Sequence, residues 1–236
     1  RKYKNSSIFV PGGQSTQLIV GATKETDLNI LTLSENLYNK FALKRVYYSA
    51  YVPVNSGKNL PDIKNPPTLR EHRLYQGDWL LRVYGFNSNE LLNEANPNFD
   101  INFDPKTTYA LNNIHLFPVE INKASYEMLI RVPGIGIRGA KKIVSARRVN
   151  SLDFLDLKKL GIVLKRAQYF ITCRGKYFGA VSFDELKIKK ALKPKVDLNY
   201  IDEDIEQISF FDAPSISENN KLLLLNDKST SLTGEL

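Results

Sequence analysis

The stretch VPGIGIRGAKKIV (residues 132–144) places two glycines around one aliphatic residue, directly before a basic segment. Gly134 and Gly136 can adopt positive φ angles, which a tight turn between two helices often requires, and their lack of side chains admits a close backbone approach. Ile135 between them can turn inward and hold the turn against a core. These features predict a helical hairpin.

A basic helix is predicted over about 137–148, after the glycines. Its apolar residues recur at helical spacing: Ala140, Ile143 and Val144. Its cations are Lys141, Lys142, Arg147 and Arg148. Because the first N–H groups of a helix lack partners and carry partial positive charge, a phosphate oxygen suits that position.

A shorter helix is predicted before the glycines, and Pro133 ends it. Asn122 is a plausible N-cap, with Ser125 as the alternative start. The apolar face of this helix consists of Ala124, Met128, Leu129 and Val132. The segment from Ile130 to Val144 resembles the helix-hairpin-helix motif, which implies binding to the DNA backbone. An ordinary structural hairpin with a glycine-rich turn is the alternative.

The resemblance implies a set of DNA-contacting residues: Pro133, Gly134, Ile135, Gly136, Arg138, Gly139, Lys141 and Lys142. Hairpins of this kind contact backbone, so we expect weak sequence preference. A second, degenerate hairpin is predicted at residues 160–162, with Lys165 and Arg166 opening the helix that follows. A helix pair that only completes the packing is its alternative. Residues 119–178 are therefore expected to form an all-α DNA-binding domain.

The charge distribution supports this location. The chain has a net charge of +8, and residues 119–178 hold 13 Lys or Arg against 4 Asp or Glu. Residues 201–236 hold 2 against 8, so the positive charge is concentrated in the predicted domain. This is the electrostatic footprint of a phosphate binder. RNA is an alternative ligand, but DNA is preferred because no aromatic-rich RNA-binding pattern accompanies the charge.

Composition narrows the possible classes of protein and of binding site further. The single cysteine, Cys173, excludes an intramolecular disulfide and a cysteine-based cluster or zinc site within the chain. No apolar run is long enough to span a bilayer, and no signal peptide precedes the first strand. We expect a cytoplasmic protein, and we expect the chain to be a fragment because it starts at Arg1.

The N-terminal part reads as α/β. Strands are expected at 8–10 and 46–54, a further apolar stretch lies at 18–20, and helices are expected after Thr23 and over 69–84. Strand–helix–strand of this length fits a parallel crossover. Residues 11–17 are expected to form a polar loop at a strand's carboxyl end, where α/β proteins place ligands. A structural turn is the alternative.

The candidate ligand-binding residues of that loop are Gln14, Ser15, Thr16 and Gln17. Residues 96–118, rich in Asn, Asp and Pro, are expected to connect the two domains. Asp100 and Asp104 lack a third ligand, so no metal site is predicted there. His72 is expected to be a solvated residue of a charged helix and not a catalytic one.

Four segments carry a second resemblance: residues 9–22, 45–54, 69–76 and 116–122. Together they resemble the C-terminal half of the putative DNA modification/repair radical SAM proteins, over about residues 1–178. The resemblance implies that residues 1–95 are the end of a partial TIM-type barrel, with residues 14–17 facing S-adenosylmethionine. It implies a uracil-DNA-glycosylase-like partner as well.

The family's Cys-x3-Cys-x2-Cys motif for a 4Fe–4S cluster is absent, and we expect it upstream of Arg1. The chain alone is then not catalytic. The competing class is a non-enzymatic DNA-binding adaptor that recruits a glycosylase or a sliding clamp. A nuclease is less favoured because no clustered carboxylates suited to metal-assisted cleavage appear.

Residues 179–236 are expected to be a flexible tail, since the apolar pattern fades there. Within it, QISFFD (residues 207–212) resembles the bacterial sliding-clamp-binding peptide. The residues implied to anchor that peptide are Gln207, Ile208, Phe210 and Phe211. Chance occurrence of a short degenerate peptide is the alternative.

Overall fold

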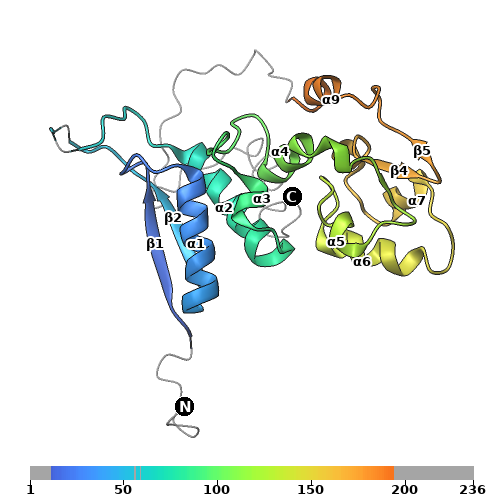
Figure 1. Ribbon diagram of the computed structural model, residues 1–236, viewed down its shortest axis with the longest axis horizontal. Coiled ribbons are helices and arrows are strands. Elements are labelled where there is room, and N and C mark those ends of the chain that lie inside the picture. Colours follow the sequence, from blue (N-terminus) through green and yellow to red (C-terminus); the bar gives the residue numbers. More distant parts are fainter. Residues whose placement is uncertain (1–11, 56, 59, 194–236) are drawn as a thin grey trace, which may run out of the picture. The chain divides into compact units, whose positions relative to one another are not determined.

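The computed structural model describes residues 12–55, 57–58 and 60–193 (Figure 1). The chain divides after Asn112 into two compact units, which are described separately below. Among the described residues, no helix is long and apolar enough to cross a membrane.

The first unit contains two strands and four helices among its described residues. In chain order these are β1 (Ser15–Val20), α1 (Asp27–Phe41), β2 (Arg45–Ala50), α2 (Thr68–Tyr84), α3 (Ser88–Leu91) and α4 (Pro105–Asn112). The strands pair in parallel, from Ser15 opposite Arg45 to Val20 opposite Ala50. The expected parallel crossover is therefore confirmed, with α1 as its helix.

Two local predictions for this unit are wrong. Ser15, Thr16 and Gln17 belong to β1 and not to a loop, because the strand begins three residues earlier than the apolar run suggested. The cap of α1 is Thr26 and not Thr23, since the Thr26 hydroxyl accepts from the Asn29 N–H at 3.2 Å. The strand expected at 8–10 lies outside the described residues.

Side chains close the outer edge of β2. The N–H groups of Val46 and Tyr48 donate to the hydroxyls of Tyr38 and Tyr75, both at 3.0 Å. The N–H of Ala50 donates to Glu71 at 2.7 Å. An uncovered strand edge is a template for unwanted pairing. These three bonds satisfy alternate N–H groups of β2, so the sheet is closed on this side by α1 and α2.

The segment expected to be a connector, 96–118, is divided between the units, since residues 96–112 contribute to the first unit and residues 113–118 belong to the second. Helix α4 packs against α2 and α3, and Phe99 and Phe103 before it are buried. Asp27 fixes this segment by accepting from the Phe99 N–H at 3.0 Å. The polar composition suggested a linker, but the Asn and Asp side chains bond to nearby backbone within the fold. The Asp100 carboxylate, for example, accepts from the Asn102 N–H at 2.6 Å.

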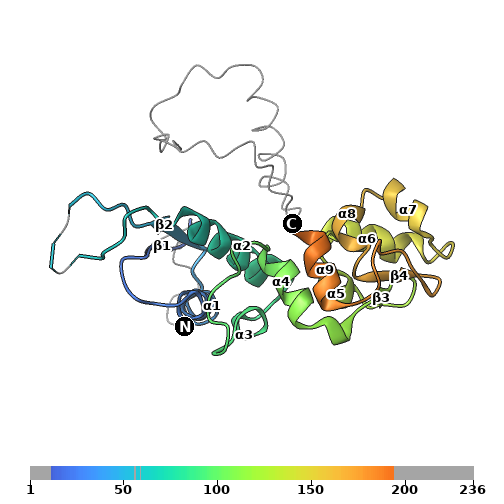
Figure 2. The same cartoon turned by 90° about the horizontal axis from the view of Figure 1, so that it is seen from above.

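The second unit combines short helices with a small sheet (Figure 2). Its elements are η1 (Ile114–Leu116), β3 (Val119–Glu120), α5 (Tyr126–Leu129), α6 (Ile137–Ala146), α7 (Phe154–Lys159), α8 (Leu164–Ala167), β4 (Ile171–Cys173), β5 (Lys176–Tyr177) and α9 (Glu185–Leu192). The described strands form one sheet in the order β3-β4-β5. The prediction of an all-α domain is thus wrong, because strands this short leave no alternating pattern in the sequence.

The prediction of a flexible tail from 179 onward is wrong for its first residues. Asp184 caps α9 by accepting from the Lys187 N–H at 3.0 Å, and Ile188 is fully buried. The tail from 194 to 236, with the clamp-like peptide, lies outside the described residues.

Glu120 ties the small sheet to the first hairpin. Its carboxylate accepts from the N–H groups of Gly175 at 2.8 Å, Arg174 at 3.1 Å and Asn122 at 3.2 Å. Partial burial raises the pKa of Glu120, but the donors at Gly175 and Asn122 outweigh it and hold the pKa below its usual range. The ionised carboxylate is therefore part of the folded unit.

Candidate nucleic-acid interface

The first helix of the hairpin begins at Ser125. The Ser125 hydroxyl accepts from the Met128 N–H at 3.1 Å, so the alternative cap is the correct one. Asn122 has another role, because its side chain donates to the carbonyl of Leu152 at 2.9 Å and accepts from the Leu152 N–H at 2.8 Å. This pair joins the chain just before α5 to the chain just before α7.

Gly134 is required by both its backbone angle and its surroundings. Its φ is +81°, a conformation that favours glycine. A Cβ atom there would lie 2.5 Å from the Val163 carbonyl oxygen and 3.0 Å from the Ala167 nitrogen. Gly136 differs, since its φ of −84° is open to any residue. The expectation of positive φ therefore holds for Gly134 and is wrong for Gly136.

Ile135 points inward as expected and is fully buried. Pro133 and Gly134 are also buried, so the turn is seated against the core of the unit. Of the eight residues predicted to contact DNA, these three pack the turn against the core of the unit. All three are buried.

The second hairpin repeats the first. Gly161 has the same φ of +81° as Gly134. Ile162 is buried as Ile135 is. Ala167 stands where Ala140 stands in the first hairpin, six residues after the glycine, and both alanines are fully buried. The degenerate hairpin predicted at residues 160–162 is thus confirmed as a structural repeat.

The two hairpins are joined directly at their turns. The Val163 N–H donates to the Gly134 carbonyl at 3.2 Å. Ile162 fills the space beside Gly139, where a Cβ atom would lie 2.6 Å from the Ile162 Cδ1. Gly139 therefore has a packing role that the sequence did not reveal. A spacing of six residues from Gly134 to Ala140 and from Gly161 to Ala167 was the available signal.

The amino end of α6 presents backbone N–H groups. Gly136 is the N-cap, and no described side chain caps the helix. The first intrahelical bond runs from the Ala140 N–H to the Gly136 carbonyl at 2.8 Å. The N–H groups of residues 137–139 precede it and have no acceptor within the helix. Arg138 in this first turn is exposed.

The cations of the two hairpins differ in exposure and in whether another described residue bonds to them. Lys141 is exposed on α6. Lys142 is exposed too, but its Nζ donates to the Leu160 carbonyl at 3.1 Å, at the end of α7. Arg147 donates to the Ile121 carbonyl at 2.8 Å and serves the fold. Lys165 adds an exposed cation on α8.

Residues 117–165 match the helix-hairpin-helix motif. The matched segment includes both turns and the cations between them. Helix-hairpin-helix motifs are typical of non-specific DNA binding. No curated protein and no solved structure matches the chain.

The other predicted ligand-binding residues lie in the first unit. Gln14 accepts from the Lys44 N–H at 2.7 Å through its carbonyl, and the Gln17 amide donates to the Ser49 hydroxyl at 2.6 Å. Both lie at or near the amino end of β1, whereas α/β proteins bind ligands beyond the carboxyl ends of strands. The strand expected at 8–10, whose carboxyl end this segment was predicted to follow, lies outside the described residues, so a ligand-binding role for residues 14–17 stays a prediction.

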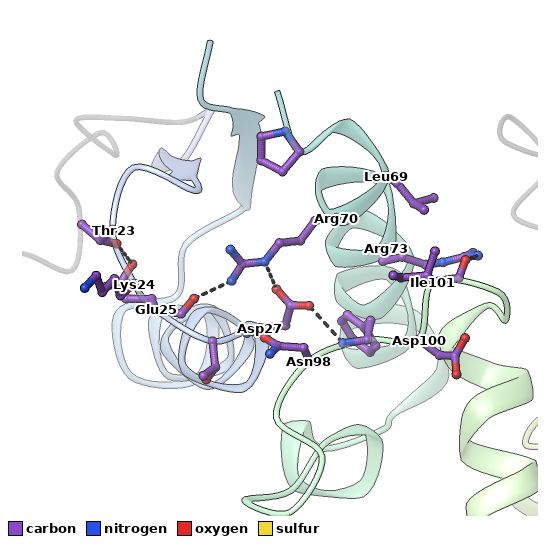
Figure 3. Close-up of a pocket in the computed structure, with 13 residues that line it drawn as sticks. Thr23, Lys24, Glu25, Asp27, Leu69, Arg70, Arg73, Asn98, Asp100 and Ile101 are labelled. Carbon is purple, nitrogen blue, oxygen red and sulfur yellow. Dashed lines mark hydrogen bonds and ion pairs between the residues drawn. The ribbon is translucent and has the colours of Figure 1, made fainter. Parts of the chain in front are cut away.

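A cavity of about 570 Å³ lies elsewhere in the first unit, beside the amino end of α1 and the start of α2 (Figure 3). Asp27 at its base is buried, and it bonds to Arg70 at 2.5 Å and to the Phe99 N–H at 3.0 Å. These bonds make Asp27 a structural anchor. Among the described residues, no group of three or more His, Cys, Asp and Glu is placed to hold a metal ion.

Proposed function

We propose that the paired hairpins of residues 119–178 bind the phosphate backbone of DNA without sequence preference. The observation that carries the proposal is the direct bond between the two turns, from the Val163 N–H to the Gly134 carbonyl. It sets two turns of like geometry side by side, with exposed cations on the helices that follow each. A rigid pair of this kind suits two neighbouring stretches of backbone.

The residues proposed to contact phosphate are chosen by which groups of the hairpins are exposed. The N–H groups of residues 137–139 at the start of α6 would hold one phosphate, with the macrodipole in its favour. Arg138 and Lys141 would add charge on the same helix. Pro133, Gly134 and Ile135 shape the loop, and Gly136 leaves space for a phosphate to approach. Gly139 and Lys142 hold the second hairpin in place, and Lys142 adds charge.

The test is a salt series with the full chain. Fluorescence anisotropy with two duplexes of unrelated sequence should give similar Kd values that rise steeply with salt. Replacing both Arg138 and Lys141 with Gln removes about two phosphate contacts, so the slope of log Kd against log salt should fall by about 1.8. The matched control is Lys40→Gln with Lys64→Gln, two exposed lysines of the first unit, which makes the same change in net charge.

A salt slope that both double variants lower equally would show diffuse attraction and would remove the hairpin from the proposal. Strong discrimination between the two duplexes would contradict backbone recognition. An RNA duplex of the same sequence provides the comparison for the alternative ligand.

A finer proposal rests on the sequence resemblance alone. It is that the chain works as the C-terminal part of a radical SAM enzyme on DNA, beside a uracil-DNA-glycosylase-like partner. The parallel β1–α1–β2 unit is compatible with the end of a barrel. The chain's own residues do not fit the cluster, because Cys173 is its one cysteine and is buried in β4. A 4Fe–4S cluster would then have to be held by cysteines outside this chain.

A Cys-x3-Cys-x2-Cys motif encoded in frame upstream of the codon for Arg1 would support the enzyme, and a coding region without it would support the adaptor. S-adenosylmethionine binding at residues 14–17, a sliding clamp as partner of residues 207–211 and a cytoplasmic setting remain predictions. A clamp pull-down with the full chain and its Gln207→Ala, Phe211→Ala variant tests the peptide. Equal retention would discard it.

A further inference from the structure

We propose that the aromatic pair of Phe154 and Phe178 is a stacking platform for an unpaired base of bound DNA. The proposal rests on the DNA binding proposed above and goes beyond it, because it names a class of DNA. The rings are stacked, with centroids 4.6 Å apart and planes inclined by 15°. Phe178 remains 39% exposed, so part of its side chain is open to solvent.

The platform lies close to the second hairpin. Phe154 begins α7, and the turn at Gly161 follows the end of that helix. Six helical residues span about 9 Å. One strand of a duplex carries a phosphate every ~3.4 Å, so this distance is about two to three phosphates. A backbone held at the second turn would thus bring a nearby base within reach of Phe178.

The charges around the platform fit a nucleic acid. Lys158 lies four residues after Phe154, on the same face of α7. Lys176 stands two residues before Phe178, which places both on one side of an extended segment. Both lysines are exposed. Proteins hold single strands with aromatic side chains, on which bases stack, beside cations that follow the backbone.

The nearby carboxylates are already engaged. The Asp153 carboxylate accepts from the Asp156 N–H at 3.0 Å, and the Asp156 carboxylate accepts from the Asp153 N–H at 3.1 Å. This reciprocal capping keeps both at the start of α7. Arg174 donates to Ser151 beside them and is exposed. Lys158 and Lys176 remain exposed beside these bonded groups, which favours a polyanion such as DNA over an uncharged apolar partner.

Stacking on a phenylalanine ring needs a base that has left the duplex. It is tolerant of sequence, because every base has a π-face. We therefore expect the chain to prefer DNA with a bulge, mismatch or single-stranded end over a fully paired duplex. Stacking of one base would strengthen binding about tenfold.

The experiment compares two fluorescein-labelled duplexes that differ by one unpaired nucleotide. The full chain should bind the bulged duplex about tenfold more tightly. Phe178→Leu, which keeps an apolar side chain for packing, should remove this preference and leave the Kd for the paired duplex unchanged. Phe178→Tyr should retain the preference. Val149→Ala, at a residue 82% exposed, is the control and should change neither Kd.

Equal binding of the two duplexes by the unchanged chain would overturn the platform while leaving the hairpin proposal intact. An equal loss on both duplexes in Phe178→Leu would assign Phe178 to the fold. Failure to bind either duplex would contradict the proposed function instead. An acidic peptide that competes through Phe178, with no gain from the bulge, would assign this surface to a protein partner.

Discussion

The N–H of Val163 donates to the carbonyl of Gly134 across 3.2 Å, and this bond joins the turns of two hairpins that are 27 residues apart in the sequence. A side chain at Gly134 would clash with the residue that donates this bond, since its Cβ would lie 2.5 Å from the Val163 carbonyl oxygen. The glycine is therefore needed twice, once for its positive φ and once for the contact between hairpins.

Gly134→Ala should lower the free energy of unfolding of the second unit by about 2–4 kcal/mol. The estimate combines an alanine at positive φ with a clash against backbone atoms that cannot move away cheaply. Thermal unfolding followed by circular dichroism, together with hydrogen exchange in α6 and α8, measures the loss.

Gly161→Ala is the matched control. Gly161 has the same φ of +81°, but the nearest described atom to its Cβ position is the Lys142 Nζ at 4.0 Å. Only the backbone penalty of about 1 kcal/mol should remain. Equal losses at the two glycines would show that the contact between the turns contributes little.

Substitutions at Lys141 and Lys142 should separate an effect on DNA binding from an effect on the stability of the fold. Lys141→Gln should weaken DNA binding and leave the melting temperature unchanged, because its side chain is exposed. Lys142→Gln should weaken binding and also lower stability by up to about 1 kcal/mol, since it loses the bond to the Leu160 carbonyl. A Kd series and a melting curve for each variant decide this. Identical behaviour of the two variants would contradict the assignment.

The sequence alone predicted those features that depend on residues close together in the chain. Two glycines around Ile135, followed by cations, predicted the first hairpin, and the inward isoleucine and the positive φ at Gly134 followed from the residue types. The parallel crossover followed from the order of apolar segments. In each case the pattern and the structure depend on the same few neighbouring residues.

The sequence did not reveal which residues far apart in the chain pack or bond together. Gly136 and Gly134 look alike in the chain, but Gly134 has a φ of +81° and lies against Val163 and Ala167, whereas Gly136 has a φ of −84°. The strands β3 and β5 are two residues each, too short to show alternation. Asn122 resembled an N-cap, yet it bonds Leu152, 30 residues away. The polar segment before α4 read as a linker because its buried Phe99 and Phe103 are isolated among Asn and Asp.

Glu120 should make the second unit sensitive to acid. Its pKa is held below the usual value near 4.5, so the folded state favours the ionised carboxylate. The stability that this provides is present above the unfolded pKa and is lost as the pH falls through the folded pKa. Unfolding of the full chain should therefore become easier below about pH 4.5. Glu120→Gln should flatten this part of the profile, whereas Glu127→Gln, at an exposed residue of α5, should reduce it less.

Lys106 should give the first unit the opposite dependence. Its side chain is fully buried in α4, with Nζ 4.7 Å from the centre of the Tyr84 ring. Burial lowers the pKa of Lys106 to about 7, although Asp104 opposes the shift. Between this value and the ordinary 10.5, the unfolded chain binds a proton that the folded chain does not, so stability should rise with pH. Urea unfolding followed through the tryptophan fluorescence of Trp79 should show the rise from neutral pH to about pH 9. Lys106→Met keeps the length of the side chain without a charge, and its stability should not rise over this range. A rise that survives the substitution would assign the effect to another group.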